Sequence, residues 1–590
     1  MKKKGTQSGN VFDLKIIKRI YGFLKPYQLR FWLLVFLIML MACVVPLNPL
    51  LIRYTIDHYI AEQNQSKLLQ MFFLMIAVLL VQGALQFVIT YNAGWLGQTV
   101  IRDIRVQLYQ KILSLKLKFF DDTPIGRLVT RTVSDVETLN DVFSEGLAAI
   151  AGDILQLLLI TAAMFWIDWR LTVICLCTVP FMLLATYIFK EHIKKSFNEV
   201  RTAVANLNTF VQEHITGMNI VQIFNAEKQE YDKFYKINET HRDANIKSIW
   251  AYSVYFPVVD VILASATALI VWFGAKHILL QDMTVGTLTA FIMFMNLFFK
   301  PIRFLADRFN TLQMGIVSTE RIITLLDSKD YVTNNGSHIA NDLKGQVVFK
   351  NVWFAYLEDN YVLKNISFEV QSGKTIALVG ATGAGKSSTI NLLSRLYEIN
   401  KGQICIDGID LHLYDLFALR KQIGVVLQDV FLFSDSIQNN ISLGDESITL
   451  DKIKEAAKLV GADDFIMNLP GNYQYNVMER GATLSVGQRQ LISFVRVLVH
   501  DPKIIVLDEA TSSIDSETEI LIQNAIEKMM KGRTAILIAH RLSTIQKADE
   551  ILVLDKGEIK EKGSHHQLLL QKGYYAELYN MQFESNGQVS

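Results

Sequence analysis

A glycine-rich segment with a lysine and two serines lies between an apolar run at 375–379, which predicts a buried strand, and a helical pattern. The segment fits Gly-x-x-x-x-Gly-Lys-Ser, a spacing filled by Gly380, Ala381, Thr382, Gly383, Ala384, Gly385, Lys386 and Ser387, and Ser388 follows it. Glycines in this arrangement let backbone N–H groups surround phosphate oxygens, and the following helix presents its positive end. Lys386 is expected to reach the β- and γ-phosphates, and the Ser387 hydroxyl to bind Mg²⁺.

Two carboxylates end a second apolar strand, expected over 503–508, much further along the chain. Asp508 is the expected second Mg²⁺ ligand, and Glu509 is placed to polarise an attacking water molecule. The phosphate-binding segment and this acidic pair together predict a nucleoside triphosphatase.

The first half of the chain carries six long apolar runs, at 31–52, 68–90, 146–167, 171–189, 253–273 and 285–299. Most of them reach or approach the ~20 residues that cross a hydrocarbon core of about 30 Å. They predict six transmembrane helices; the alternative is a set of core helices in a large soluble protein. The composition changes near 328–341, and short β-branched strands then alternate with helical segments, which predicts an α/β unit.

We therefore expect a transmembrane domain at 1–327, a linker at 328–341 and a nucleotide-binding domain at 342–590. The 590 residues are 51% hydrophobic, with 58 Lys and Arg against 57 Asp and Glu. The net charge of +1 argues against nucleic acid as a partner held by bulk charge. The apolar content excludes a mostly disordered chain.

Basic residues indicate the orientation in the membrane. Eight Lys and Arg lie within 1–30 and sixteen in the connections 91–145 and 190–252, whereas the three short connections hold four. Because positive residues stay cytoplasmic, both termini are expected inside a multi-pass protein of the plasma (inner) membrane. Apolar and basic faces before the first span predict an N-terminal helix in the membrane interface. Helical periodicity at 102–117, 127–143, 200–212 and 220–236 predicts helices that continue past the bilayer.

The second half resembles the nucleotide-binding domain of ATP-binding cassette (ABC) transporters. The matching residues are Tyr356 for the adenine-stacking aromatic, Gln428 for the Q-loop, Glu479-Arg480-Gly481 for a membrane-contact segment, Ser485, Val486, Gly487 and Gln488 for the signature, Asp515 for the D-loop and His540 for the switch histidine. The resemblance covers the whole chain. It implies an α-helical six-span type I exporter membrane domain fused to an α/β P-loop (RecA-like) nucleotide-binding domain with a helical subdomain. ATP and Mg²⁺ are the implied cofactors.

The resemblance gives several residues specific roles, and each has a plainer alternative. Tyr356 stacks on adenine, or packs under the sheet edge. Gln428 senses Mg²⁺ and water, or is an ordinary amide at a strand end. His540 orients the γ-phosphate and the water, or is a hydrogen-bonded core histidine. Ser485 and Gln488 also form the S-x-x-Q pattern of a helix capping box.

In the family, the signature closes over the γ-phosphate bound by the other subunit, so a dimer is implied. The usual signature is Leu-Ser-Gly-Gly-Gln, and here Val486 replaces the first glycine. The substitution is either tolerated or marks a heterodimeric exporter, in which the subunit with the intact glutamate commonly carries the altered signature. We favour a second, different half-transporter as the partner; a homodimer is the alternative.

The implied function is ATP-driven export of hydrophobic or amphipathic compounds, drug-like molecules or lipids, by alternating access with hydrolysis assisted by Glu509. Segments 119–121, 124–126 and 214–224 resemble the regions through which exporters of this family couple their two domains. The alternatives are a homodimeric lipid flippase and an ATP-gated channel or channel regulator. Membrane lipids and a small amphipathic substrate are the other expected partners.

Two acidic residues lie inside predicted transmembrane helices, where ionisable groups are costly and often functional. Asp153 and Asp260 are therefore candidates for the substrate path, and Asp260 is suited to attract a cation. The alternative for Asp260 is a structural pair with a polar group such as Gln156. Phe291, Phe294, Met295 and Phe298 form a stripe that favours lipid contact or helix packing over a substrate pocket.

Overall fold

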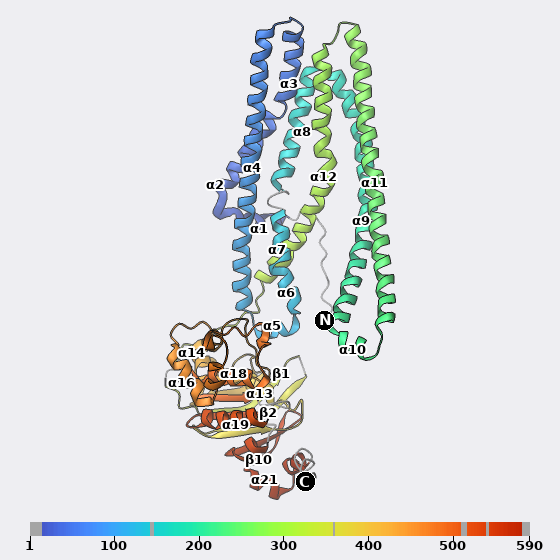
Figure 1. Ribbon diagram of the computed structural model, residues 1–590. Helices are drawn as coiled ribbons and strands as arrows, with labels where there is room; N and C mark the ends of the chain where they lie inside the picture. The colour runs from blue at the N-terminus through green and yellow to red at the C-terminus, as the bar shows by residue number, and fades with distance from the viewer. Residues whose placement is uncertain are drawn as a thin grey trace. The chain divides into compact units, whose positions relative to one another are not determined.

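The computed structural model describes residues 14–141, 147–340, 342–357, 360–508, 516–538 and 542–580. Contacts divide the chain into two compact units, Met1–Leu113 with Ile125–Lys329, and Ser114–Pro124 with Asp330–Ser590 (Figure 1). The short segment Ser114–Pro124 thus groups with the second unit, although its neighbours in sequence belong to the first. The domain boundaries expected from the sequence stay predictions.

The first unit is a bundle of helices. Their bounds are α1 Leu14–Leu24, α2 Gln28–Val44, α3 Leu47–Tyr54, α4 Gln65–Leu113, α6 Ile125–Thr132, α7 Ser134–Asp141, α8 Leu147–Ile167, α9 Trp169–Thr216, α10 Met218–Ile223, α11 Glu227–Leu279 and α12 Val285–Leu326. Within the described residues, six stretches are long and apolar enough to cross a membrane. The prediction of six spanning helices is confirmed, and the expected N-terminal helix is present as α1.

Three helices are far longer than a bilayer requires. The helices α4, α9 and α11 have 49, 48 and 53 residues. At ~1.5 Å per residue each is about 70–80 Å long, more than twice a ~30 Å hydrocarbon core. Figure 1 shows α9 and α11 packed side by side, with α10 at their common end.

Three of the helical stretches predicted beyond the membrane differ in the structure, and one of them, 127–143, is divided between α6 and α7 at Val133. The helix expected over 102–117 stops at Leu113 because Leu115 instead forms a β-bridge with Tyr331. The helix expected over 220–236 is interrupted at Asn225, whose φ of 49° is left-handed, so that α10 and α11 are separate. Asn tolerates this conformation better than most residues.

The aromatic stripe of α12 packs inside the helical unit. Phe291, Phe294 and Met295 have no exposed surface and Phe298 is 5% exposed. They form one core with α8, α9 and α11, in which Met295 Sδ lies 3.1 Å from Cys175 Sγ. The interpretation as a helix-packing surface is confirmed.

The second unit contains two sheets. Its strands are β1 Val347–Ala355, β2 Tyr361–Val370, β3 Thr375–Val379, β4 Lys401–Ile406, β5 Ile409–Asp410, β6 Ile423–Val426, β7 Ile504–Asp508, β8 Thr534–Ile538, β9 Glu550–Asp555 and β10 Glu558–Gly563. One sheet has the order β2-β1-β4-β5 and is antiparallel. The other has the order β10-β9-β3-β8-β7-β6, and its strands from β9 to β6 are parallel.

The remaining elements of this unit are helices, as expected for a nucleotide-binding domain with a helical subdomain. They are α5 Leu117–Asp122, α13 Lys386–Leu393, α14 Leu416–Lys421, α15 Ile437–Ser442, α16 Leu450–Val460, α17 Asp463–Met467, α18 Val486–Leu498, α19 Ser516–Met530, α20 Leu542–Gln546, α21 His565–Gln571 and α22 Tyr574–Tyr579. The strand predicted at 375–379 is β3, and the one predicted at 503–508 is β7. A parallel sheet gathers the carboxyl ends of its strands along one edge, which is where a phosphate site forms.

Asp57 joins the C-terminal end of the first span to the start of α12. Its carboxylate accepts hydrogen bonds from Thr284 Oγ1 at 2.7 Å and from the Gly286 backbone N–H at 2.8 Å. Arg53 Nε lies 3.7 Å from the same carboxylate, whose side chain is 9% exposed. This largely buried carboxylate thus lies at a helix N-terminus, where the helix dipole favours negative charge.

We expect Gly286→Ala to break this junction. An added Cβ would lie 2.5 Å from Asp57 Oδ1 and 2.6 Å from the Arg53 carbonyl oxygen, too close for either to remain in place. Leaving a buried carboxylate without its donors costs about 1–3 kcal/mol, so the unfolding temperature in lipid nanodiscs should fall. Gly83→Ala is the matched control, because its Cβ meets nothing within 4 Å. Equal unfolding temperatures for the two variants would contradict the role given to the junction.

Candidate functional site

The glycine-rich loop connects β3 to α13 and curves tightly. Gly380, Gly383 and Gly385 have φ of 156°, 83° and 104°, conformations that L side chains rarely adopt. A Cβ at Gly380 would lie 2.1 Å from the Leu554 carbonyl oxygen, so this position has room only for glycine. The loop opens directly onto the N-terminus of α13, which makes it suited to bind an anion.

Lys386 lies inside this loop. Its Nζ donates to the carbonyl oxygens of Gly380 at 2.6 Å and Ala381 at 3.0 Å, and the residue is 7% exposed. Burial lowers the pKa of its ammonium group, and the carboxylate of Asp508 opposes that change. A phosphate oxygen offers this ammonium a stronger, charged acceptor than a backbone carbonyl.

Ser387 and Asp508 are brought together from distant parts of the chain. The Ser387 hydroxyl donates to Asp508 Oδ2 at 3.5 Å, at the carboxyl end of β7. Gln428 is exposed and follows β6, the parallel neighbour of β7. A hydroxyl, a carboxylate and an amide oxygen at one sheet edge form a donor set that fits Mg²⁺. These residues would hold the ion, whose chemistry is to neutralise phosphate charge.

Tyr356 lies just beyond β1, close to the start of α13. Its hydroxyl is 3.1 Å from Ser388 Oγ and accepts a hydrogen bond from Asn391 Nδ2 at 3.4 Å. Its ring meets Tyr397 edge-on, with centroids 5.0 Å apart. The ring is half-buried, so it remains a candidate for adenine stacking.

Tyr397 connects this aromatic group to α5. Its hydroxyl donates to the carboxylate of Asp121, and the backbone N–H of Lys116 donates to the Asp330 carbonyl at 2.9 Å. Residues 114–124 are therefore fastened to the second unit beside Tyr356. The sequence indicates that segment 119–121 is a coupling region, but it does not predict this pairing, because nothing local to Tyr397 marks its partner.

The signature segment begins α18. Ser485 Oγ accepts from the Gln488 backbone N–H at 3.2 Å, and Gln488 Oε1 accepts from the Ser485 N–H at 3.0 Å. The predicted capping box is confirmed. Gly487 is buried, whereas the Val486 side chain next to it is 48% exposed.

Three of the predicted site residues, Glu509, Asp515 and His540, lie outside the described residues, and their roles stay predictions. Asp508 directly precedes Glu509 in the chain and pairs with Ile538 on the adjacent parallel strand.

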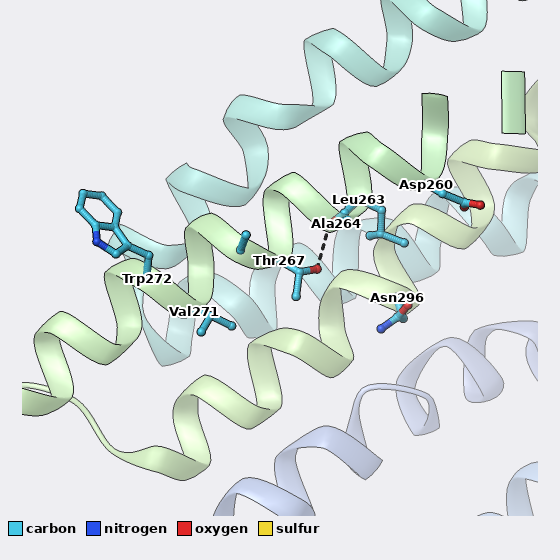
Figure 2. A pocket seen from close by; sticks show the side chains of 8 residues that line it. Asp260, Leu263, Ala264, Thr267, Val271, Trp272 and Asn296 are labelled. Atoms are coloured by element: carbon cyan, nitrogen blue, oxygen red, sulfur yellow. Dashed lines mark hydrogen bonds between the residues drawn. The ribbon is translucent and has the colours of Figure 1, made fainter. Parts of the chain in front are cut away.

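Asp260 lines a pocket of about 750 Å³ in the helical unit. Figure 2 shows the side chains concerned, which are Asp260, Leu263, Ala264, Thr267, Ala268, Val271 and Trp272 of α11 with Asn296 of α12. Asp153 is half-buried on α8 and is not among the residues that line this pocket. Both carboxylates interact with neighbouring groups, so the structural alternative also stays open.

The helical bundle and the phosphate-binding loop at a parallel sheet define an ATP-dependent membrane protein. Residues 31–302 match the family model "ABC transporter transmembrane region", and residues 363–512 match the model "ABC transporter". The chain belongs to the ABC transporter family and is an ATP-hydrolysing transporter of exporter type.

Proteins of similar sequence match this chain over almost its full length. The chain is 37% identical to "Uncharacterized ABC transporter ATP-binding protein YknV" of Bacillus subtilis, covering 96% of this chain and 94% of that protein. It is 32% identical to "ATP-dependent lipid A-core flippase" of Syntrophus aciditrophicus, covering 97% and 95%. A solved structure, "Structure of a bacterial Atm1-family ABC exporter with ATP bound", matches with a TM-score of 0.78 and 28% identity, covering 94% of this chain and 98% of that one.

Replacing Tyr356 separates stacking from hydrogen bonding. Tyr356→Ala should weaken ATP binding by roughly ten- to a hundredfold, because base–aromatic stacking contributes about 1–3 kcal/mol. Tyr356→Phe keeps the ring and should bind almost normally. Titration with a fluorescent ATP analogue measures both variants. If Tyr356→Phe lost as much affinity as Tyr356→Ala, the hydroxyl contacts with Ser388 and Asn391 would be the important ones instead.

Proposed function

We propose that this protein is one half of a heterodimeric exporter that moves hydrophobic or amphipathic compounds out of the cell. Two surfaces support a dimer, the first being the exposed start of α18. The phosphate-binding loop and the signature each precede the N-terminus of a different helix of the same unit, α13 and α18. We infer that each of them forms a site with a second chain. ABC exporters act as dimers, in which the loop of one subunit faces the signature of the other.

The second surface is the end of the α9–α11 pair. Its exposed apolar residues, by exposed fraction, are Ile215 at 67%, Met218 at 41%, Ile220 at 55%, Ile223 at 70% and Phe224 at 73%. Five exposed apolar side chains within residues 215–224 suit a contact site. His214 joins α9 to α11 at this end, because its Nε2 lies 2.7 Å from Glu230 Oε2. Its Nδ1 lies 2.7 Å from the Phe210 carbonyl oxygen.

In the proposed cycle, ATP bound at two composite sites pulls the nucleotide-binding units together. The segments at α5 and α10 carry this movement to the long helices, and the cavity then opens to the outside. Glu509 assists attack of water on the γ-phosphate while Lys386 neutralises phosphate charge, and hydrolysis resets the inward-facing state. Mg²⁺, held by Ser387, Asp508 and Gln428, would add to this neutralisation. ATP drives the change because it binds the closed state more tightly.

The heterodimer is favoured by Val486 in combination with Glu509 and His540. The intact glutamate and histidine suit a hydrolysing site completed by the partner's regular signature, while Val486 faces the partner's weaker site. The topology proposed with it places both termini and the nucleotide-binding unit in the cytoplasm, at the plasma membrane.

A homodimeric lipid flippase is the second candidate, favoured by the similarity to a lipid A-core flippase. ATP-dependent movement of fluorescent lipid in vesicles containing this chain alone would support it. A channel or channel regulator is less well supported, because the glutamate and histidine for hydrolysis are both present in the sequence.

The ATPase activity of the chain purified alone tests the heterodimer. We expect low activity that Val486→Gly raises at least severalfold, because the smaller residue lets the signature backbone approach the γ-phosphate. Glu509→Gln in the Val486→Gly background is the control and should abolish hydrolysis while keeping ATP binding. Full, substrate-stimulated turnover by the unmodified chain alone would reject the heterodimer in favour of a homodimer.

A further inference from the structure

An arginine at the start of the first span stacks on an indole and has no acidic partner. Arg30 directly precedes the apolar run 31–52, and its guanidinium carbon lies 3.5 Å from the centroid of the Trp95 ring. Arg30 is exposed and forms no ion pair with a carboxylate of the described residues. A guanidinium stacked on a ring keeps N–H donors at its edge, where they can bind phosphate oxygens in pairs. The charge is therefore held in place without being neutralised.

Trp95 lines a pocket of about 520 Å³ on α4, the helix that packs beside α2 (Figure 1). The other lining residues are Thr90, Tyr91, Gly94, Gln98, Thr99 and Arg102, and none of them is acidic. Trp95 and Arg102 are seven positions apart, which places them on one face of the helix and about 10 Å apart along it. The pocket therefore has one arginine in its wall and a second arginine stacked on its indole.

Tyr27 fixes the geometry of this wall. Its ring meets Trp95 edge-on, with centroids 6.0 Å apart, and its hydroxyl donates to Asp103 Oδ2 at 2.6 Å. Arg102 donates from Nε and Nη2 to Asp103 Oδ1, at 3.0 Å and 2.7 Å. The charge of Asp103 is thereby compensated by Arg102, and the positive charge of Arg30 is left over.

The remaining pocket residues offer polar groups below the indole and aromatic surface above it. Gln98 is exposed and its amide makes no hydrogen bond to a described residue, while Thr99 Oγ1 donates to the Trp95 carbonyl at 2.7 Å and keeps its acceptor capacity. These two side chains can bind hydroxyl groups. Tyr91, one turn toward the span, is 62% exposed and stacks on Phe87 with centroids 6.3 Å apart.

We propose that this pocket binds the headgroup of an anionic phospholipid, with the phosphate at Arg30, headgroup hydroxyls at Gln98 and Thr99, and the acyl chains over Tyr91 and Phe87. Because the hydrocarbon core begins at Phe31, Arg30 and the Trp95 ring lie at the level of the lipid headgroups. The topology proposed above assigns the site to the inner leaflet, where anionic lipids attract basic residues. The site is separate from the nucleotide site and independent of the compound that is exported.

The same residues disfavour a zwitterionic lipid. The trimethylammonium group of phosphatidylcholine donates no hydrogen bond to Gln98 or Thr99, and it would bring a positive charge toward Arg102. The glycerol headgroup of phosphatidylglycerol carries hydroxyls and no positive charge. Phosphatidylglycerol is therefore the lipid that the pocket suits best of these two.

Binding of two lipids with identical acyl chains tests the proposal. The full-length protein, purified in detergent, is titrated with dioleoyl phosphatidylglycerol or dioleoyl phosphatidylcholine, and native mass spectrometry measures the dissociation constant of the first bound lipid. We expect phosphatidylglycerol to bind at least severalfold more tightly. Glycerophosphoglycerol, the same headgroup without acyl chains, is added as a competitor at the concentration of the lipid and should displace none.

Two variants act on the pocket in different ways. Arg30→Gln should raise the dissociation constant of phosphatidylglycerol by roughly tenfold, as expected for loss of hydrogen bonds to a charged group, and should leave that of phosphatidylcholine unchanged. Gly94→Leu should weaken phosphatidylglycerol binding without changing any charge. A Cβ at Gly94 meets nothing within 4 Å, so the added side chain occupies the pocket without disturbing the helix.

Each variant has a matched control on α4. Arg105→Gln removes the same charge from a residue one turn beyond Arg102, 44% exposed and paired with Glu137 at 3.4 Å. Gly83→Leu adds the same volume at a glycine whose Cβ also meets nothing within 4 Å. Both controls should bind phosphatidylglycerol as tightly as the unmodified protein.

The outcomes separate a lipid site from its alternatives. Equal affinities of the unmodified protein for the two lipids, or equal effects of Arg30→Gln and Arg105→Gln, would overturn the proposal. Displacement of the lipid by glycerophosphoglycerol would also overturn it, because the site would then bind a soluble phosphate compound. The same spectra report the subunit composition, so loss of the dimer in Arg30→Gln and Gly94→Leu alone would assign the pocket to a subunit contact instead. A loss confined to phosphatidylglycerol in these two variants supports the lipid site.

Discussion

The phosphate-binding loop depends on the placement of one ammonium group, Lys386 Nζ. The group is buried, so it must be surrounded by acceptors, and the loop supplies the carbonyl oxygens of Gly380 and Ala381. Buried charges are tolerated only with such partners. Glycines at positive φ make the tight curve possible, and β3 and α13 hold its two ends. A triphosphate would accept hydrogen bonds from this ammonium group, and the Asp508 carboxylate, which would bind the metal ion, lies beside Ser387 at the end of β7.

A short segment of the nucleotide-binding unit is covalently continuous with the helical unit on both sides and is held by residues distant in sequence. Residues 114–124 belong by their contacts to the nucleotide-binding unit, although both ends of the segment continue into helices of the other unit. The Asp121–Tyr397 hydrogen bond lies one ring away from Tyr356. A change in the position of the Tyr356 or Tyr397 ring can therefore be passed directly to a segment that is covalently continuous with α4 and α6.

Features whose physics is local were predictable from the sequence. The β3 strand followed from a short apolar run beside glycines, and the capping box from Ser485 and Gln488, because each depends on neighbours in the chain. The spans followed from the thickness of a bilayer. The Asp57–Gly286 junction, the Asp121–Tyr397 pair and the pocket around Asp260 depend on which distant segments of the chain meet, and no periodicity encodes that. The break at Asn225 was not predicted because the apolar repeat continues across it. A single residue in the left-handed conformation nevertheless ends the helix.

The helix that begins at Val486 shows which properties of the protein the substitution can affect. The cap of α18 is made by the side chains of Ser485 and Gln488 and by backbone N–H groups, none of which needs glycine at position 486. Valine keeps its own backbone N–H, so the anion-binding end of the helix retains its donors. The added isopropyl group is half exposed and does not fill the core of its own unit. Any cost of the substitution therefore falls on the surface presented to a partner, and an altered signature can coexist with a fully stable nucleotide-binding unit.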